Sequence, residues 1–89
     1  MNFVWDSEKN KKLQRERGVT FEDVLIAFSL DNVLDILEHP NSEKYSHQKI
    51  FIVKILNYIY IVPFVENETE IFLKTIIPSR KMTKKYLQI

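Results

Sequence analysis

Cysteine is absent from the 89 residues, which excludes disulfide bonds, thiolate catalysis and zinc sites with cysteine ligands. A single glycine is present, so no glycine-rich loop for nucleotide phosphates is expected. No apolar run approaches the roughly 18 residues that a membrane-spanning helix needs, and no basic leader precedes an apolar stretch as in a signal peptide. We therefore expect one cytoplasmic domain over residues 1–89, without association with a membrane.

The net charge is small, but its distribution along the chain is uneven. Residues 1–17 carry five basic and three acidic side chains, a net charge of +2. Residues 18–73 carry three and nine, a net charge of −6, and residues 74–89 carry five and none, a net charge of +5. These sum to the +1 of the whole chain. If the two basic ends meet in space, they form a positive patch that the net charge hides.

Capping signals predict where the helices begin and end. Asp6 is a suitable N-cap for a polar helix over residues 7–17, and Gly18 is the expected terminator. Thr20 and Asp23 form a capping-box pattern, and apolar residues then recur at i, i+3, i+4 and i+7. This pattern predicts a second helix over residues 21–29. A short third helix is expected over residues 82–87.

Strand signals dominate the rest of the chain. The expected strands are residues 3–5 (or an apolar anchor), 33–38, 50–56, 58–65 and 70–77. Their near-continuous apolar character indicates that both faces of the sheet are covered. Asn57 is expected to take the left-handed conformation of a tight turn, and Pro63 to mark a bulge or a strand end. The sequence thus predicts an α+β fold: an antiparallel sheet of about four to five strands, an N-terminal helical pair on one face and a short C-terminal helix.

Two motifs at the ends of the chain resemble those of BrnT-type toxins. The opening FVWD (residues 3–6), the polar helix and GVTFED (residues 18–23) resemble the aromatic-x-Trp-Asp strand and Gly-[Val/Ile]-[Ser/Thr]-Phe-Glu-Glu helix start of that family. The closing IIPSRKMTKK (residues 76–85) resembles its Ile-[Ser/Ile]-x-[Ala/Ser]-Arg-[Lys/Arg]-Ala-Thr segment. The chain departs from the pattern in residues 39–48, at the turn 56–58, and at Met82 and Tyr86, so we expect a divergent member.

The resemblance implies a RelE-like fold and the toxin of a bacterial type II toxin–antitoxin pair. Such toxins are endoribonucleases that use no metal ion or cofactor and block translation, with RNA, alone or on the ribosome, as substrate. Their usual partner is a small ribbon-helix-helix antitoxin. The complex represses its own operon, and operator DNA is bound only through the antitoxin.

Metal-free cleavage of RNA uses the 2′-hydroxyl as nucleophile and needs a base, an acid and a cation beside the phosphorane. Arg80 is the first candidate for the cation, because its planar guanidinium binds two phosphate oxygens at once and stays charged. The alternative is that Arg80 pairs with a surface carboxylate or with the C-terminal helix.

Five more residues near the C-terminus are candidates for RNA binding: Lys74, Lys81, Lys84, Lys85 and Tyr86. Lys81 shares a helix face with Lys84 or Lys85, which suits a phosphate backbone or an ordinary solvated surface. Lys74 interrupts a strand and either points to solvent or lies beside the site. Tyr86 either stacks on a base or anchors its helix to the sheet.

Four residues of the polar segment 39–48 are candidates for the acid and the base: His39, Lys44, Tyr45 and His47. The histidines have an unperturbed pKa near neutrality. The lysine and tyrosine qualify because RelE-type enzymes often use these residue types instead. A role in loop structure is the alternative for each. No third ligand accompanies the two histidines, so no metal site is expected.

A second function stays open at the level of sequence, namely a catalytically inactive binding module of the same fold. Such a module would act as antitoxin partner or transcriptional co-repressor. The small net charge and the lack of an obvious acid–base pair favour the binding module. The ordered motifs and the cations around Arg80 favour the ribonuclease.

Overall fold

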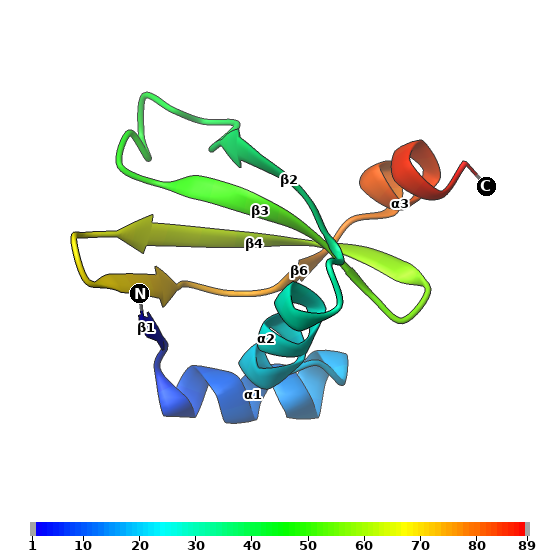
Figure 1. Cartoon of the computed structure of the whole chain (residues 1–89), viewed down its shortest axis with the longest axis horizontal. Helices are drawn as coiled ribbons and strands as arrows, with labels where there is room; N and C mark the ends of the chain where they lie inside the picture. Colours follow the sequence, from blue (N-terminus) through cyan, green and yellow to red (C-terminus); the bar gives the residue numbers. More distant parts are fainter. Residues whose placement is uncertain (1, 89) are drawn as a thin grey trace.

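The computed structural model describes residues 2–88, which form a twisted sheet with helices on both sides (Figure 1). The helices are α1 (Ser7–Arg17), α2 (Phe21–Ser29) and α3 (Arg80–Leu87). The strands are β1 (Asn2–Val4), β2 (Val33–Glu38), β3 (Lys49–Ile55), β4 (Tyr58–Glu66), β5 (Glu70–Leu73) and β6 (Ile77–Pro78). The predicted α+β class is confirmed. Among the described helices, none has both the length and the apolar character that crossing a membrane requires.

The sheet is larger and more mixed than the sequence predicts. Its strand order is β1-β5-β4-β3-β2, and β6 pairs with β4. β1 is parallel to β5 and every other pairing is antiparallel, so the sheet is mixed, and its six strands slightly exceed the predicted four to five. The predicted strand over residues 70–77 is divided into β5 and β6. The chain leaves the ladder between them, where Ile76 turns into the core and is fully buried.

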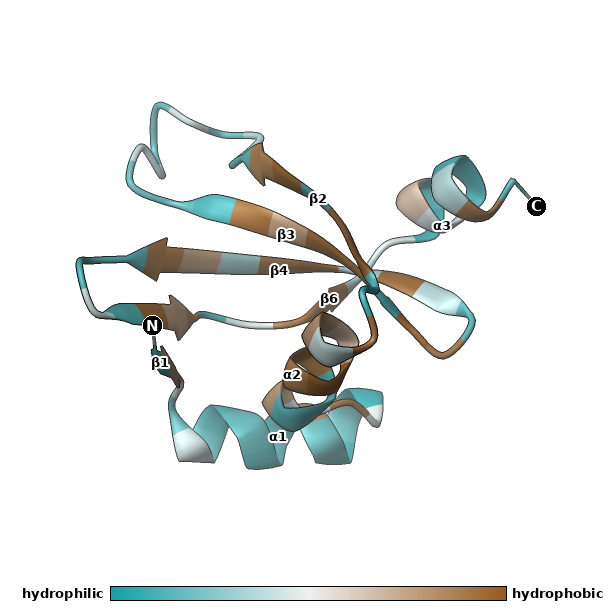
Figure 2. Cartoon of the chain, in the orientation of Figure 1, coloured by the Kyte–Doolittle hydropathy of each residue, from teal (hydrophilic) through white to brown (hydrophobic). Residues whose placement is uncertain are grey.

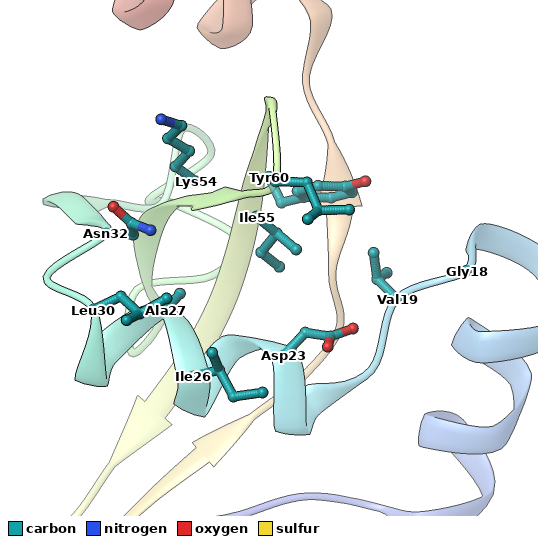
Figure 3. Close-up of a pocket in the computed structure, with 11 residues that line it drawn as sticks. Gly18, Val19, Asp23, Ile26, Ala27, Leu30, Asn32, Lys54, Ile55 and Tyr60 are labelled. Atoms are coloured by element: carbon teal, nitrogen blue, oxygen red, sulfur yellow. The ribbon is translucent and has the colours of Figure 1, made fainter.

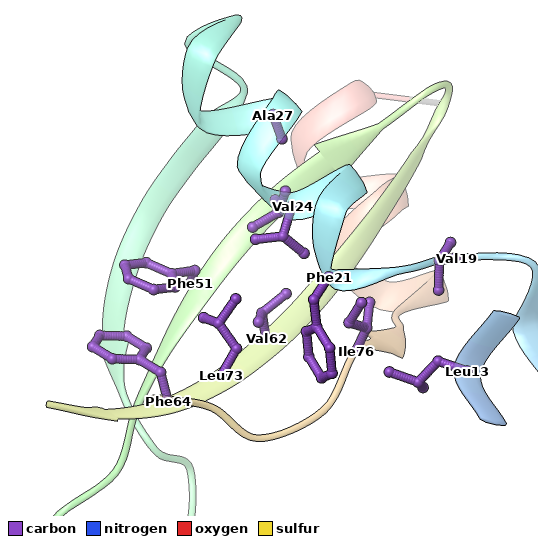
Figure 4. Packing of buried hydrophobic residues seen from close by; sticks show 11 residues of the cluster. Leu13, Val19, Phe21, Val24, Ala27, Phe51, Val62, Phe64, Leu73 and Ile76 are labelled. Atoms are coloured by element: carbon purple, nitrogen blue, oxygen red, sulfur yellow. The ribbon is translucent and has the colours of Figure 1, made fainter. Parts of the chain in front are cut away.

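Helices cover both faces of the sheet, as the apolar strands predict. The helix-pair face lies under α1 and α2, and its cluster includes Leu13, Phe21, Val24, Phe51 and Phe64 (Figure 4). The opposite face, called the α3 face, packs under α3. Its buried residues are Ile50, Ile52 and Ile59, which contact Met82, Tyr86 and Leu87. The alternation follows from the two-residue period of a strand, which sends successive side chains of β3 to opposite faces.

The helix ends follow from the capping residues. The Asp6 carboxylate accepts hydrogen bonds from backbone N–H groups in the first turn of α1, and Gly18 ends that helix in the left-handed conformation at φ 68°. Thr20 and Asp23 form the complete capping box of α2. Leu13 is the buried residue of α1, whose remaining surface is hydrophilic (Figure 2). The predicted bounds of α1 and α2 are confirmed.

The predictions for Pro63 and Asn57 are wrong, because the pairing of the neighbouring strands sets the backbone conformation at these two positions. Pro63 lies inside β4, in register with β3 and without a bulge. Its carbonyl accepts from the Lys74 N–H, so its nitrogen faces the gap between β5 and β6, where no ladder bond is lost. In the β3–β4 turn, Leu56 rather than Asn57 takes the left-handed conformation, at φ 55°. Leu56 is also 88% exposed.

Candidate functional site

Helix α3 is fixed to the sheet at its N-terminal end by one buried hydroxyl. Thr83 is 2% exposed, and its Oγ1 accepts a hydrogen bond from the Ile59 N–H at 2.9 Å. The same hydroxyl donates to the Ser79 carbonyl at 2.7 Å. The Ser79 side chain caps the helix by accepting from the Met82 N–H. The first turn of α3 is therefore held rigidly against β4.

The cations of α3 lie on its exposed side. Met82, Tyr86 and Leu87 pack on the sheet, which turns the opposite side of the helix to solvent. The exposed cations there are Arg80, Lys81, Lys84 and Lys85. Among residues 2–88, the two ion pairs join Lys11 to Glu8 and Lys49 to Glu66, so no cation of α3 forms an ion pair with a carboxylate. The alternative in which Arg80 pairs with a surface carboxylate is not the arrangement seen.

The positions of Arg80 and Lys81 are unfavourable for the helix itself. Both lie in the first turn of α3, which contains no acidic residue. The positive end of the helix dipole disfavours a cation there by about 0.3–1 kcal/mol, and an anion is favoured by a similar amount. Free N–H groups, a guanidinium and an ammonium are thus exposed within one turn of the helix. A phosphate group would satisfy all three, so this turn is suited to bind one.

Two other candidates from the C-terminal segment also lie on the α3 face. The Lys74 Nζ is 5.3 Å from the ring centre of Phe72, whose side chain projects from β5 away from the helix-pair core. Tyr86 donates its hydroxyl to the Asp35 carboxylate at 3.2 Å. Burial, and then the hydrogen bond to Asp35, raise the pKa of Tyr86. Tyr86 therefore has the anchoring contacts that the sequence left as an alternative to base stacking.

Three of the four loop candidates form a second group. The ring centres of His39 and Tyr45 are 4.4 Å apart, and the Lys44 Nζ lies 5.3 Å from the Tyr45 ring centre. The His39 Nδ1 accepts a hydrogen bond from the Asn41 N–H, which requires that nitrogen to be unprotonated. His47 is exposed, and no side-chain contact joins it to the group among the described residues.

The sheet separates the loop group from the start of α3. Ser79 bonds to Ile59, which is in register with Lys54, whereas the loop adjoins Lys49 at the other end of β3. Five residues of extended strand span roughly 17 Å, so the start of α3 and the loop group are separate surfaces at the two ends of β3. Figure 1 shows the loop and α3 at opposite ends of β3.

The two basic ends of the chain also stay apart. Helix α1 covers the helix-pair face and α3 covers the opposite one. Their nearest link is Arg17, whose Nη1 donates to the Ile76 carbonyl ahead of β6. The positive patch that would arise if the ends met is therefore absent, and the α3 face presents its cations alone.

A pocket on the helix-pair side was not among the predictions from the sequence. A pocket of about 400 Å³ lies between α2, the segment before it and the β3–β4 turn (Figure 3). Asp23, Asn32 and Tyr60 supply polar groups to walls that are mainly aliphatic. Burial raises the pKa of Tyr60, with smaller contributions from Tyr58 and Asp23. The available signal was Ile26 and Leu30, two apolar residues outside the buried stripe of α2.

Within residues 2–88, no group of three or more His, Asp or Glu side chains is arranged to hold a metal ion. No curated protein and no solved structure shows significant similarity to the chain. A family model does match residues 5–85, and its description is a ribonuclease toxin, BrnT, of a type II toxin–antitoxin system. That match includes both capped N-terminal helices and most of α3 with its exposed cations. The chain belongs to the BrnT family of type II toxin–antitoxin ribonuclease toxins.

Proposed function

We propose that this chain is a metal-independent endoribonuclease that acts in the cytoplasm, blocks translation and holds RNA on the exposed side of α3. The observation that carries the proposal is the first turn of α3, where Arg80 and Lys81 point to solvent without a carboxylate partner. Two cations at the N-terminus of a helix do not stabilise the fold. Both would stabilise a bound RNA phosphate.

The reaction needs no group from outside the protein and RNA. The 2′-oxygen attacks phosphorus as its proton passes to a base, and the bond from phosphorus to the 5′-oxygen breaks as an acid protonates that oxygen. The products are a 2′,3′-cyclic phosphate and a 5′-hydroxyl. Arg80 is placed to bind two phosphate oxygens and stabilise the phosphorane. Lys81, Lys84, Lys85 and Lys74 continue the basic surface along the strand of RNA.

The loop group of His39, Lys44 and Tyr45 takes a different part. Because it lies at the other end of β3 from α3, we assign it to nucleotides that flank the one proposed to bind Arg80. Because the Asn41 N–H occupies the His39 Nδ1, the Nε2 of that ring is the nitrogen left for a base, and Tyr45 presents an aromatic ring, so the loop is suited to stack and hydrogen-bond a base. His47, exposed in the same loop, has the same role open to it.

The test is cleavage of single-stranded RNA by the purified chain in the presence of a chelator. Arg80→Ala should lower kcat by about 10²–10³-fold, the effect of removing one preorganised donor from a charged transition state. Arg15→Ala is the matched control, because Arg15 is an exposed arginine in the last turn of α1 on the other side of the sheet. Arrest of growth on expression, relieved by Arg80→Ala, reports the block of translation.

The same assay locates the reacting phosphate. If His39→Ala abolishes kcat while Arg80→Ala only raises KM, the reaction takes place at the loop and α3 merely holds the substrate. That result would overturn the role given to Arg80. Loss of cleavage on chelation would overturn metal independence.

A second candidate function is a binding module without catalysis. The absence of an acid or base beside Arg80 among the described contacts favours it. In that case the chain arrests neither growth nor translation, yet still forms a complex with its antitoxin. For either function we propose a small ribbon-helix-helix antitoxin as partner, with operator DNA bound only through that antitoxin and RNA cleaved alone or on the ribosome.

A further inference from the structure

The pocket on the helix-pair side has an exposed aliphatic rim. Ile26 and Leu30 project from α2 with 54% and 63% of their surface exposed, and Leu56 at the β3–β4 turn is 88% exposed. All three line the one pocket. Burying such side chains is favourable by about 25 cal/mol for each Å² of apolar surface. The rim is thus an apolar surface that this chain alone leaves in water.

The conformation of Leu56 is a second, independent indication that the rim binds a partner. Its left-handed conformation, at φ 55°, costs a residue other than glycine roughly 1–2 kcal/mol. Asparagine or glycine would take that conformation more easily. A leucine that is strained and also 88% exposed contributes nothing to the folded monomer. Contact with a second molecule would give this side chain its use.

The charge around the pocket selects the class of partner. Two carboxylates, Asp23 in the lining and Asp31 between the lining residues Leu30 and Asn32, outnumber the one cation of the lining, Lys54. None of these carboxylates is in either of the ion pairs formed by residues 2–88. An acidic, aliphatic surface repels RNA and attracts a basic, apolar protein segment. The basic α3 face, with the opposite preference, is on the other side of the sheet.

We infer that this pocket is the docking site of the antitoxin, which inserts the apolar face of an amphipathic helix flanked by Lys or Arg. A helix is favoured because the pocket is lined by α2 and the β3–β4 turn, and no residue of the edge strands β1 and β2 lines it. A small molecule inside the pocket would leave the three rim side chains exposed. The inference rests on family membership alone, so it stands whether or not the chain cleaves RNA.

The test measures the affinity of this chain for its cognate antitoxin by titration calorimetry. Ile26→Lys should weaken binding at least tenfold, since it places a buried, unpaired cation among basic partner residues. Ile36→Lys is the matched control, because Ile36 has the same 54% exposure but lies on β2, away from the pocket. The control should leave affinity within twofold. RNA cleavage should be unchanged in both variants.

A second variant separates docking from folding. Leu56→Gly relieves the left-handed strain and removes the exposed side chain, so it should raise the melting temperature while weakening antitoxin binding. Equal losses from Ile26→Lys and Ile36→Lys, or no loss from Ile26→Lys and Leu56→Gly, would sink the inference.

Two other occupants give distinct results. If the pocket joins two copies of this chain, sedimentation of the chain alone shows a dimer that Ile26→Lys dissociates. If it takes RNA, the cation added by Ile26→Lys raises the affinity for a single-stranded oligonucleotide. Either result overturns antitoxin docking.

Discussion

Replacing Thr83 by valine should weaken the attachment of α3 to the sheet, with little change in the shape of the side chain. The Ile59 N–H is buried and has the Thr83 Oγ1 as its partner at 2.9 Å. Valine keeps the volume but removes that acceptor, and a buried donor left without a partner costs about 1–3 kcal/mol. The Ser79 carbonyl retains its bond from the backbone N–H of residue 83, so the loss is confined to one group. Each kcal/mol lowers the melting temperature of a domain of this size by roughly 4–8 °C.

The matched control is Thr83→Ser, which keeps the hydroxyl and loses one methyl group worth about 0.8 kcal/mol. Thermal unfolding followed by circular dichroism should rank stability as native, then serine, then valine. Hydrogen exchange should show the Ile59 amide faster only in the valine variant. The affinity for RNA should also fall in the valine variant, because the attachment of α3 to the sheet sets the direction of Arg80 and Lys81. A valine variant as stable as the serine variant would refute the reasoning, since the hydroxyl would then carry no net stabilisation.

Three further predictions concern the stability of the domain. Gly18→Ala should lower it by about 1 kcal/mol in denaturant unfolding through backbone strain alone, because no atom lies within 4 Å of an added Cβ at φ 68°. The pKa of Tyr60 is raised from 10.0, so the protonated side chain contributes to the stability of the domain fully below pH 10, and this stability is lost as the pH rises above that value. Tyr60→Phe should remove this loss of stability at alkaline pH. A hydrogen bond from Asn10 lowers the pKa of Glu22 below 4.5, so the ionised carboxylate contributes to the stability of the domain above that pH, and this stability is lost as the pH falls. Glu22→Gln should reduce the loss of stability at acid pH.

The parts of the fold that were predictable are those set by neighbouring residues. Asp6, Gly18 and Thr20 act on backbone groups within three or four positions, and the bounds of α1 and α2 follow from them. The parallel pairing of β1 with β5 has no such signal, because Asn2 meets Glu70 across 68 positions of the chain. The same holds for Pro63, whose tolerance depends on where β5 ends and β6 begins.

The candidate site divides in the same way. The cations around Arg80 are visible as a run in the sequence, and capping by Ser79 turns them outward together. Their separation from His39 depends on the register of β3 with β4, which no local pattern gives. The pocket was not predicted, because the apolar pattern of α2 was used only to identify the residues that face the core. Ile26 and Leu30, the apolar residues left over from that pattern, were the available sign.

The pairing of β1 with β5 also sets an order of events during synthesis. A ribosome delivers residues 2–4 before their partner strand, which begins at residue 70, so β1 must wait unpaired while the residues between them are made. Helix α3 follows later still, at residues 80–87. Both the pairing of β1 and the basic surface of α3 therefore wait for synthesis of residues 70–87. A nascent chain that stops before residue 70 has neither.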